Sequence, residues 1–195
     1  MKTDQRIVRA MAELLRVQGY AATGIQQLAK AADAPTGSIY HHFKGGKAEV
    51  AAAALRETGA AYIQLLPLLL DRHDDLATAI EAAFAAAAED MEQTGWVNMC
   101  PVGTVTGEIA DSEPALREVA AEVIASWIDQ GTEYLETRGL SATDARAAMY
   151  AVLSALEGAF VLARGQRSTE PLLAAGRAMA AYVGTLPIMA DRPFS

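Results

Sequence analysis

The side chains best suited to chemistry gather between residues 36 and 47. Tyr40-His41-His42 follows the small residues Thr36-Gly37-Ser38 and precedes Lys44 and Lys47. Hydroxyl, imidazole and ammonium groups donate hydrogen bonds to anions, so one candidate chemistry is contact with phosphate groups. The alternative is a partly packed helix surface that binds no ligand. A metal site is not expected, because adjacent histidines on a helix point about 100° apart.

Other reactive patterns give no foothold for catalysis. Gly45-Gly46-Lys47 lacks the earlier glycine and the preceding strand of a nucleotide-binding loop. Cys100 is the one cysteine of the chain, so no internal disulfide forms and a reducing compartment is expected. A quiet, buried thiol is the expected role of Cys100, with redox sensing as the alternative. No serine elbow or zinc-ligand spacing occurs, so we expect no enzyme activity, cofactor or metal.

Three short helices are predicted to position residues 36–47. The first helix ends at Gly19, and Thr23 is expected to begin a capping box with Gln26 at the start of the second. Pro35 then starts a third helix over about 36–43. Ile39 and Phe43, four residues apart, face inward there, which leaves Gly37, Ser38 and His41 outward and Tyr40 and His42 beside them. Two short helices with such a break form a helix-turn-helix unit.

The rest of the chain also shows helical periodicity. We expect a long helix from about 47 that Pro67 interrupts, another from about 74, an irregular stretch over 95–107, and helices opening near 112–114, at Ser141 and over about 169–186. No period-two alternation occurs, so the fold is predicted to be all-α. The predicted division is a helix-turn-helix domain over 1–47, whose motif spans about 25–44 and continues in a linking helix to about 66, and a helical domain over 48–195.

Residues 23–47 resemble the DNA-binding region of the TetR/AcrR family of bacterial transcriptional regulators. The matching residues keep a fixed spacing over this segment and are Thr23, Ile25, Leu28, Ala29, Ala32, Gly37, Ile39, Tyr40, His41, His42, Phe43 and Lys47. The segment 34–47, together with Cys100-Pro101-Val102 and residues 112–117, is similar to the LmrA/YxaF-like subgroup. Two positions depart from the family: Asp33 replaces a turn glycine, and Thr36 stands where Lys or Arg is frequent. Both changes are expected to weaken contact with phosphates.

The resemblance implies which residues touch double-stranded DNA. The candidates are Thr23, Thr36, Gly37, Ser38, Tyr40, His41, His42 and Lys47. Gly37 lets the helix backbone approach the major groove, because it has no side chain. Tyr40 and His42 are suited to phosphates and His41 to base edges or thymine methyl groups. Lys47 is expected to join the amides of the fourth helix at a phosphate.

The resemblance also implies a ligand pocket and a dimer interface in the second domain. Aromatic, sulfur-bearing and nearby polar residues are the pocket candidates: Phe84, Met91, Trp96, Asn98, Met99, Trp127, Tyr134, Tyr150, Glu157 and Phe160. Small residues of the last two helices suit packing against a second copy, namely Ala148, Ala151, Ala155, Ala159, Ala175 and Ala178. We therefore expect a homodimeric repressor that a small apolar or aromatic inducer releases from its operator. The alternative is an all-α ligand-binding or scaffold protein with lost or weak DNA recognition.

Composition and charge agree with a globular protein and permit DNA binding. The 195 residues are 52% hydrophobic and 21% charged, which excludes a disordered chain. The net charge is −8, but residues 1–50 carry seven Lys/Arg and four Asp/Glu, a local net charge of +3. Because the Debye length is about 8 Å at physiological salt, this basic segment can meet phosphates despite the acidic remainder. The most apolar run, 59–70, is too short to cross a membrane, so we expect no membrane span and a cytoplasmic location.

Overall fold

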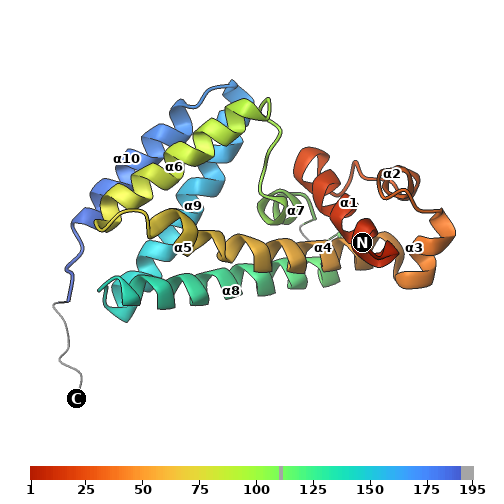
Figure 1. Ribbon diagram of the computed structural model, residues 1–195, viewed down its shortest axis with the longest axis horizontal. Coiled ribbons are helices and arrows are strands. Elements are labelled where there is room, and N and C mark those ends of the chain that lie inside the picture. The colour runs from red at the N-terminus through yellow and green to blue at the C-terminus, as the bar shows by residue number, and fades with distance from the viewer. Residues whose placement is uncertain (110–111, 190–195) are drawn as a thin grey trace, which may run out of the picture. The chain divides into compact units, whose positions relative to one another are not determined.

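The computed structural model describes residues 1–109 and 112–189, and their regular secondary structure is entirely helical, which confirms the all-α prediction (Figure 1). The helices are α1 (Thr3–Gln18), α2 (Ile25–Ala31), α3 (Thr36–His42), α4 (Gly46–Ile63), α5 (Leu65–Leu70), α6 (Leu76–Gln93), α7 (Pro101–Ile109), α8 (Pro114–Thr137), α9 (Ala142–Gln166) and α10 (Glu170–Gly184). The chain forms two compact units. Unit 1 comprises Met1–Ala61 and Met99–Ile124, and unit 2 comprises Tyr62–Asn98 and Ala125–Ser195. The sequence-based division into 1–47 and 48–195 stays a prediction.

Unit 1 is built around α1, which contacts α2, α3 and α7 (Figure 1). Ile7, Met11 and Leu15 recur every four residues along α1 and are fully buried, as are Leu28 of α2 and Ile39 of α3. One apolar face of α1 therefore holds both short helices in place. The helix ends at Gly19, whose φ of 81° is a left-handed conformation that suits glycine, as the sequence predicted.

Two local predictions in unit 1 are wrong. Helix α2 begins at Ile25 with Gly24 as its N-cap, so Thr23 does not start a capping box. The predicted irregular stretch over 95–107 contains α7, which begins at Pro101, a residue favoured in the first turn of a helix. Val102, Val105 and Ile109 of α7 are buried. This apolar spacing stabilises the helix by packing, although Gly103 and Gly107 lower its intrinsic propensity.

Unit 2 has α6 packed against α5, α9 and α10, with α6 and α10 side by side (Figure 1). Phe84 of α6 is 2% exposed, and a Cβ added at Gly176 of α10 would lie 2.7 Å from its Cβ atom. Gly176 therefore lets the two helices approach closely around this ring. Side chains cap α9 and α6: the amide of Asp144 donates to Ser141 Oγ at 3.1 Å, where the sequence predicted the start of a helix, and the amide of Thr78 donates to the Asp75 carboxylate at 2.7 Å.

The break that Pro67 was expected to cause falls three residues earlier, at Gln64, between α4 and α5. Proline has no amide hydrogen for the preceding turn, so the chain leaves the helix before Pro67 and starts a new one that contains it. A further correction concerns α9. By length and composition it is apolar enough to cross a membrane, contrary to the prediction that no segment would be. One such helix is weak grounds for a membrane span, because core helices pass the same test.

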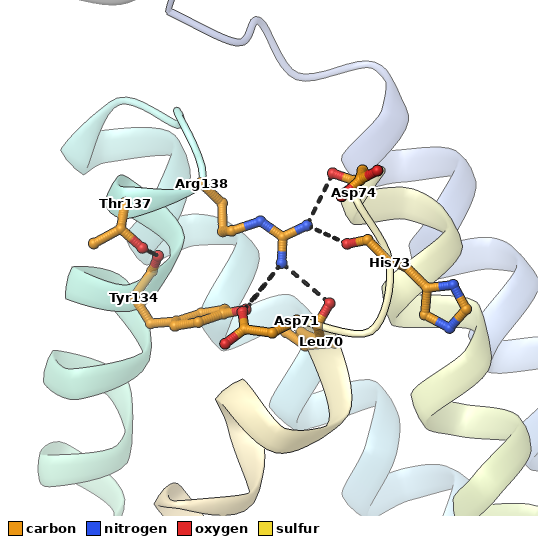
Figure 2. A network of polar contacts seen from close by, with 7 residues as sticks. All are labelled: Leu70, Asp71, His73, Asp74, Tyr134, Thr137 and Arg138. Atoms are coloured by element: carbon orange, nitrogen blue, oxygen red, sulfur yellow. Dashed lines mark hydrogen bonds and ion pairs between the residues drawn. The ribbon is translucent and has the colours of Figure 1, made fainter.

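Polar contacts fix the corner between α5 and α6 within unit 2. In what we call the Arg138 cluster, the guanidinium donates to the carbonyl oxygens of Leu70 (3.2 Å), His73 (2.8 Å) and Asp74 (3.0 Å) and to the Tyr134 hydroxyl (2.9 Å), as Figure 2 shows. Asp71 lies 3.7 Å from it and accepts from Tyr134 at 2.6 Å. The Arg138 side chain is only 16% exposed. One cation thereby satisfies three carbonyl groups of a single corner.

Candidate nucleic-acid interface

Helix α3 has the two-faced character that the sequence predicted. Ile39 is fully buried and Phe43, just after the helix, is 9% exposed, so these two residues seat α3 on unit 1. Gly37, Tyr40, His41 and His42 are exposed. Thr36 and Ser38 are half-buried at the start of the helix. The exposed residues form a polar and aromatic surface that we call the α3 outer face.

At Gly37 no side chain covers the backbone of the α3 outer face. A Cβ added at Gly37 would meet no atom of the protein within 4 Å. The glycine is therefore not required by packing within unit 1. A glycine at this position instead suits a binding partner whose surface comes close to the helix backbone.

The turn before α3 is held by a residue that sequence reasoning missed. Arg6 of α1 donates from Nε to the Ala32 carbonyl at 3.1 Å and from Nη2 to the Asp33 carbonyl at 2.9 Å. Asp33 has a φ of 48°, the left-handed geometry in which the family has glycine. Arg6 thus compensates for the unfavoured conformation of Asp33 and sets the path from α2 into α3. A contact across 26 residues gives no local sequence signal.

Thr23 is corrected as a DNA contact. Its side chain is 1% exposed and its hydroxyl donates to the Gly19 carbonyl at 2.6 Å. The Gln18 side chain also donates to this hydroxyl, from Nε2 at 3.3 Å. Thr23 therefore stabilises the turn between α1 and α2 from inside, and its hydroxyl is not accessible to a phosphate.

Lys47 and the start of α4 are already engaged within unit 1. Lys47 Nζ donates to the Tyr20 carbonyl at 3.1 Å and lies 3.9 Å from the centre of the Tyr20 ring. The Glu49 carboxylate accepts from the amide of Gly45 at 2.6 Å. A negative charge of the protein therefore bonds to the residue just before α4, next to the helix N-terminus at which the sequence predicted a phosphate.

Tyr20 is held from several sides in what we call the Tyr20 cluster, which comprises Tyr20, Lys47, Glu108 and Glu113. The Glu108 carboxylate accepts from the amides of Tyr20 (2.8 Å) and Ala21 (3.0 Å), and Glu113 accepts from the Tyr20 hydroxyl at 3.1 Å. Burial, followed by the hydrogen bond to Glu113 and its negative charge, raises the pKa of Tyr20 to about 12. Sequence reasoning missed this cluster, because its members are up to 93 residues apart.

The ten predicted ligand-binding residues do not form one set in the structure. Met99 belongs to unit 1 and the other nine to unit 2. Phe84, Met91 and Trp127 are buried, and Trp127 stacks on Tyr62 with ring centres 6.3 Å apart. Trp96, Glu157 and Phe160 are half-buried. A ligand pocket in unit 2 therefore stays a prediction.

Three polar candidates for that pocket have distinct surroundings. Tyr134 belongs to the Arg138 cluster, and burial together with Asp71 raises its pKa (Figure 2). Tyr150 is 49% exposed on α9, with Arg146 5.6 Å from its ring centre. Asn98 donates from Nδ2 to the Asp90 carboxylate, while its Oδ1 is buried without a partner among the described residues. Asn98 is therefore the candidate with an acceptor still to be satisfied.

No group of three or more His, Cys, Asp or Glu residues within 1–109 and 112–189 is placed to hold a metal ion. The site defined above is instead a short helix that presents a polar outer face, seated by two apolar residues on two supporting helices. This is an all-helical protein of the helix-turn-helix class.

Comparisons with known proteins give the family. Residues 7–54 match "Bacterial regulatory proteins, tetR family", and residues 77–178 match "Transcriptional regulator LmrA/YxaF-like, C-terminal domain". The chain is 31% identical to the transcriptional regulator YxaF of Bacillus subtilis, over 87% of this chain and 88% of that protein. It is 30% identical to the Bacillus subtilis regulator LmrA, over 87% of this chain and 90% of that protein. The chain belongs to the TetR family of transcriptional regulators, with an LmrA/YxaF-like C-terminal domain.

Solved structures agree with this assignment. A TetR regulatory protein from Rhodobacter sphaeroides superposes with a TM-score of 0.79 at 26% identity, covering 91% of this chain and 97% of that one. The reduced form of NemR from E. coli superposes with a TM-score of 0.73 at 25% identity, covering 94% and 97%. The predicted fold, a helix-turn-helix domain followed by a helical C-terminal domain, is confirmed.

Proposed function

We propose that this TetR-family regulator is a homodimeric repressor, that its α3 outer face reads a pseudo-palindromic operator in double-stranded DNA, and that a small apolar or aromatic ligand releases it. The observation that supports DNA reading is the exposed row of Gly37, Tyr40, His41 and His42 on a helix whose opposite side is buried. A helix of this kind fits the major groove, which is about 12 Å wide. An intracellular operator requires a cytoplasmic protein.

The outer face assigns different tasks to its residues. Tyr40 and His42 donate to phosphates, which sets the register of the helix on the duplex, and His41 faces the base edges. Thr36 and Ser38, half-buried at the start of α3, provide hydroxyls that can donate to phosphates. Lys47 reaches a phosphate by leaving the Tyr20 carbonyl, 3.1 Å from its Nζ in the free protein.

The support for a dimer is an exposed stripe along α9. Tyr150, Val161 and Leu162 are 49%, 60% and 55% exposed, and Ser154 and Gly158 lie exposed between them. Small and apolar residues on one helix face suit packing against a second copy. Ala148 and Ala159, which the sequence placed in this interface, are 0% and 4% exposed and pack inside the protomer instead.

Ligand release requires a difference in ligand affinity between two states of the dimer. Shifting a two-state equilibrium from 1:99 to 99:1 takes about 5.5 kcal/mol of differential binding. The aromatic side chains of unit 2 supply apolar contact area, and the free Asn98 Oδ1 is positioned to accept a hydrogen bond. The rival function, a ligand-binding protein without DNA recognition, predicts dye binding by unit 2 and no retention on DNA at low salt.

The test uses the duplex upstream of the protein's own coding region and a scrambled duplex, each titrated at several salt concentrations. Tighter binding to the upstream duplex supports the proposal, and equal affinities contradict it. Gly37→Ala separates DNA contact from folding. Since its Cβ meets no protein atom, and alanine favours a helix over glycine by about 1 kcal/mol, the variant is expected to be at least as stable as the wild type.

Gly37→Ala is nevertheless expected to weaken operator binding by about tenfold or more, because the added methyl group holds the groove away from the helix backbone. Tyr40→Ala should weaken operator binding as well while leaving the helical circular dichroism signal intact. Unchanged affinity in both variants would show that the α3 outer face is not the DNA contact.

A further inference from the structure

We infer that Glu108 of α7 is a positioning residue for operator binding: its carboxylate fixes the turn that orients the helix-turn-helix. This inference rests on the proposed function, since it concerns affinity for the operator. Glu108 lies outside the segment matched by the tetR family and inside the segment matched by the LmrA/YxaF-like domain. It nevertheless belongs to unit 1, together with α1, α2 and α3.

The first argument is the geometry of the carboxylate. One oxygen, Oε2, accepts from two consecutive amides, those of Tyr20 at 2.8 Å and Ala21 at 3.0 Å. These amides follow the C-terminus of α1 and precede α2, so they lie in the turn on which the path of the second helix depends. A carboxylate that accepts from two amides makes charge-assisted hydrogen bonds, which are stronger than neutral ones.

The second argument is the space reserved for this carboxylate. Gly19 has a φ of 81°, and a Cβ added there would lie 1.6 Å from Glu108 Oε1. Glycine at position 19 therefore suits the backbone conformation and leaves room for the Glu108 carboxylate, which a side chain there would displace. One further contact of the Tyr20 cluster holds the same residue and does not involve Lys47, because Glu113 accepts from the Tyr20 hydroxyl at 3.1 Å.

The position of this turn determines the position of α3. Thr23 donates from its hydroxyl to Gly19 and from its amide to Tyr20, at 2.6 and 3.1 Å. Gln18 and Gln27 exchange side-chain hydrogen bonds at 2.8 and 2.9 Å, which ties the end of α1 to α2. Helix α2 contacts α3. A displaced turn at Tyr20 and Ala21 would therefore tilt α2 and, with it, the α3 outer face.

The sign of the effect distinguishes this role from simple electrostatics. Glu108 is an exposed acid in the unit that must approach phosphates. If the carboxylate acted only as a negative charge, removing it would raise affinity for every DNA duplex. If it positions the turn, removing it lowers affinity for the operator and leaves affinity for a scrambled duplex unchanged or slightly raised.

The experiment compares Glu108→Ala and Glu108→Gln with Glu118→Gln, a control that removes the same charge from an exposed position of α8. We expect Glu108→Ala to lower operator affinity about tenfold, equivalent to about 1.4 kcal/mol. Glu108→Gln should lose less, because its amide oxygen still accepts, and Glu118→Gln should lose nothing. Operator affinity at or above the wild-type value in Glu108→Ala would overturn the inference.

A second measurement, without DNA, keeps the inference separate from the proposed function. Hydrogen exchange of the Tyr20 and Ala21 amides, followed by NMR on the full chain, should be faster in Glu108→Ala and unchanged in Glu118→Gln. Unchanged exchange in Glu108→Ala rejects the contact itself. Equal wild-type affinity for operator and scrambled duplex rejects the proposed function, whatever the exchange shows.

Gly19→Ala provides a coupling test for the same contact. This variant is expected to lower operator affinity in two ways, by backbone strain and by displacing the Glu108 carboxylate. The strain is present in every background, whereas the displacement is absent in the Glu108→Ala background. The loss caused by Gly19→Ala should therefore be smaller in the Glu108→Ala background than in the wild type. Strictly additive losses would contradict the role of Glu108.

Discussion

Each unit holds one turn between two helices with a charged side chain, and the two side chains have opposite charges. In unit 1 an anion, Glu108, accepts hydrogen bonds from two backbone amides that follow α1. In unit 2 a cation, Arg138, donates to three backbone carbonyls, that of the last residue of α5 and two that follow the helix (Figure 2). Each charge matches the backbone groups it meets, because amides are donors and carbonyls are acceptors.

The two contacts differ in burial, and burial decides their energetic weight. The Arg138 side chain is 16% exposed and makes contacts on both of its terminal nitrogens, whereas Glu108 is exposed and water competes for its oxygens. Exposed charge interactions contribute little to stability, while an interrupted buried one leaves polar groups unsatisfied. The comparison teaches that the Arg138 cluster should govern the stability of its unit, and that Glu108 should govern conformation more than stability.

The largest expected effect on this comparison comes from Arg138→Met. The change leaves carbonyl groups of the α5–α6 corner without their donor, so we expect a loss of about 2–3 kcal/mol in the free energy of unfolding. Urea unfolding followed by tryptophan fluorescence measures it, because Trp96 and Trp127 both lie in unit 2. Arg177→Met is the matched control, since Arg177 is 55% exposed and pairs with Glu170 at 2.9 Å. Similar midpoints for both variants would show that burial of the guanidinium does not matter.

A second, smaller effect separates the two clusters by pH. The folded state raises the pKa of Tyr20 from 10.0 to about 12, chiefly by burial, and raises the pKa of Tyr134 for the same primary reason. A raised folded-state pKa means that the stability contributed by the neutral phenol is fully present below pH 10 and is lost as the pH rises toward 12 for Tyr20. Tyr20→Phe and Tyr134→Phe should each make the alkaline loss of stability less steep.

Unfolding midpoints measured at several pH values above 9, for both variants and for Tyr40→Phe, check this prediction. Tyr40 is the control because it is 49% exposed on the α3 outer face. A wild-type slope that persists unchanged in Tyr20→Phe would mean that Glu113 and burial do not hold the phenol neutral. The ultraviolet absorbance of ionised tyrosine, compared between the wild type and Tyr20→Phe, reports unit 1 in this experiment, while tryptophan fluorescence reports unit 2.

The smallest effect comes from a pair of residues with the same backbone conformation in different units. Asp33 in unit 1 and Arg167 in unit 2 both have a φ of 48°. Replacing either with glycine relieves left-handed strain at some cost in chain entropy, so we expect each change to stabilise by at most about 1 kcal/mol. Asp33→Gly should also raise DNA affinity, since a carboxylate next to the reading helix is removed. Equal DNA affinities in the two variants would contradict the placement of the DNA contact in unit 1.

Local signals in the sequence predicted the elements that local chemistry determines. Gly19 ends α1, Ser141 caps α9, and Ile39 with Phe43 seats α3, because each depends on residues within a turn or two. Helix α7 was missed because its glycines disfavour a helix in isolation and packing of Val102, Val105 and Ile109 stabilises it. The start of α2 was misplaced because Thr23 bonds back to Gly19, which competes with capping.

The same division between local signals and distant contacts applies to the candidate site. The α3 outer face follows from helical periodicity and from the resemblance of residues 23–47. The carbonyl partners of Arg6 and Arg138 and the contact of Tyr20 with Glu108 were not predictable, since these contacts join residues at least 26 positions apart and depend on how the helices pack. Energetic control of the site therefore lies in contacts that periodicity does not reveal.

The Glu49 carboxylate on the Gly45 amide has a practical consequence for anyone who would build a biosensor on this scaffold. This contact holds a negative charge beside the residues that the proposed function places against a phosphate. Under that proposal, Glu49→Gln removes the charge and tightens operator binding, so a reporter built on this protein would need more ligand before it responds.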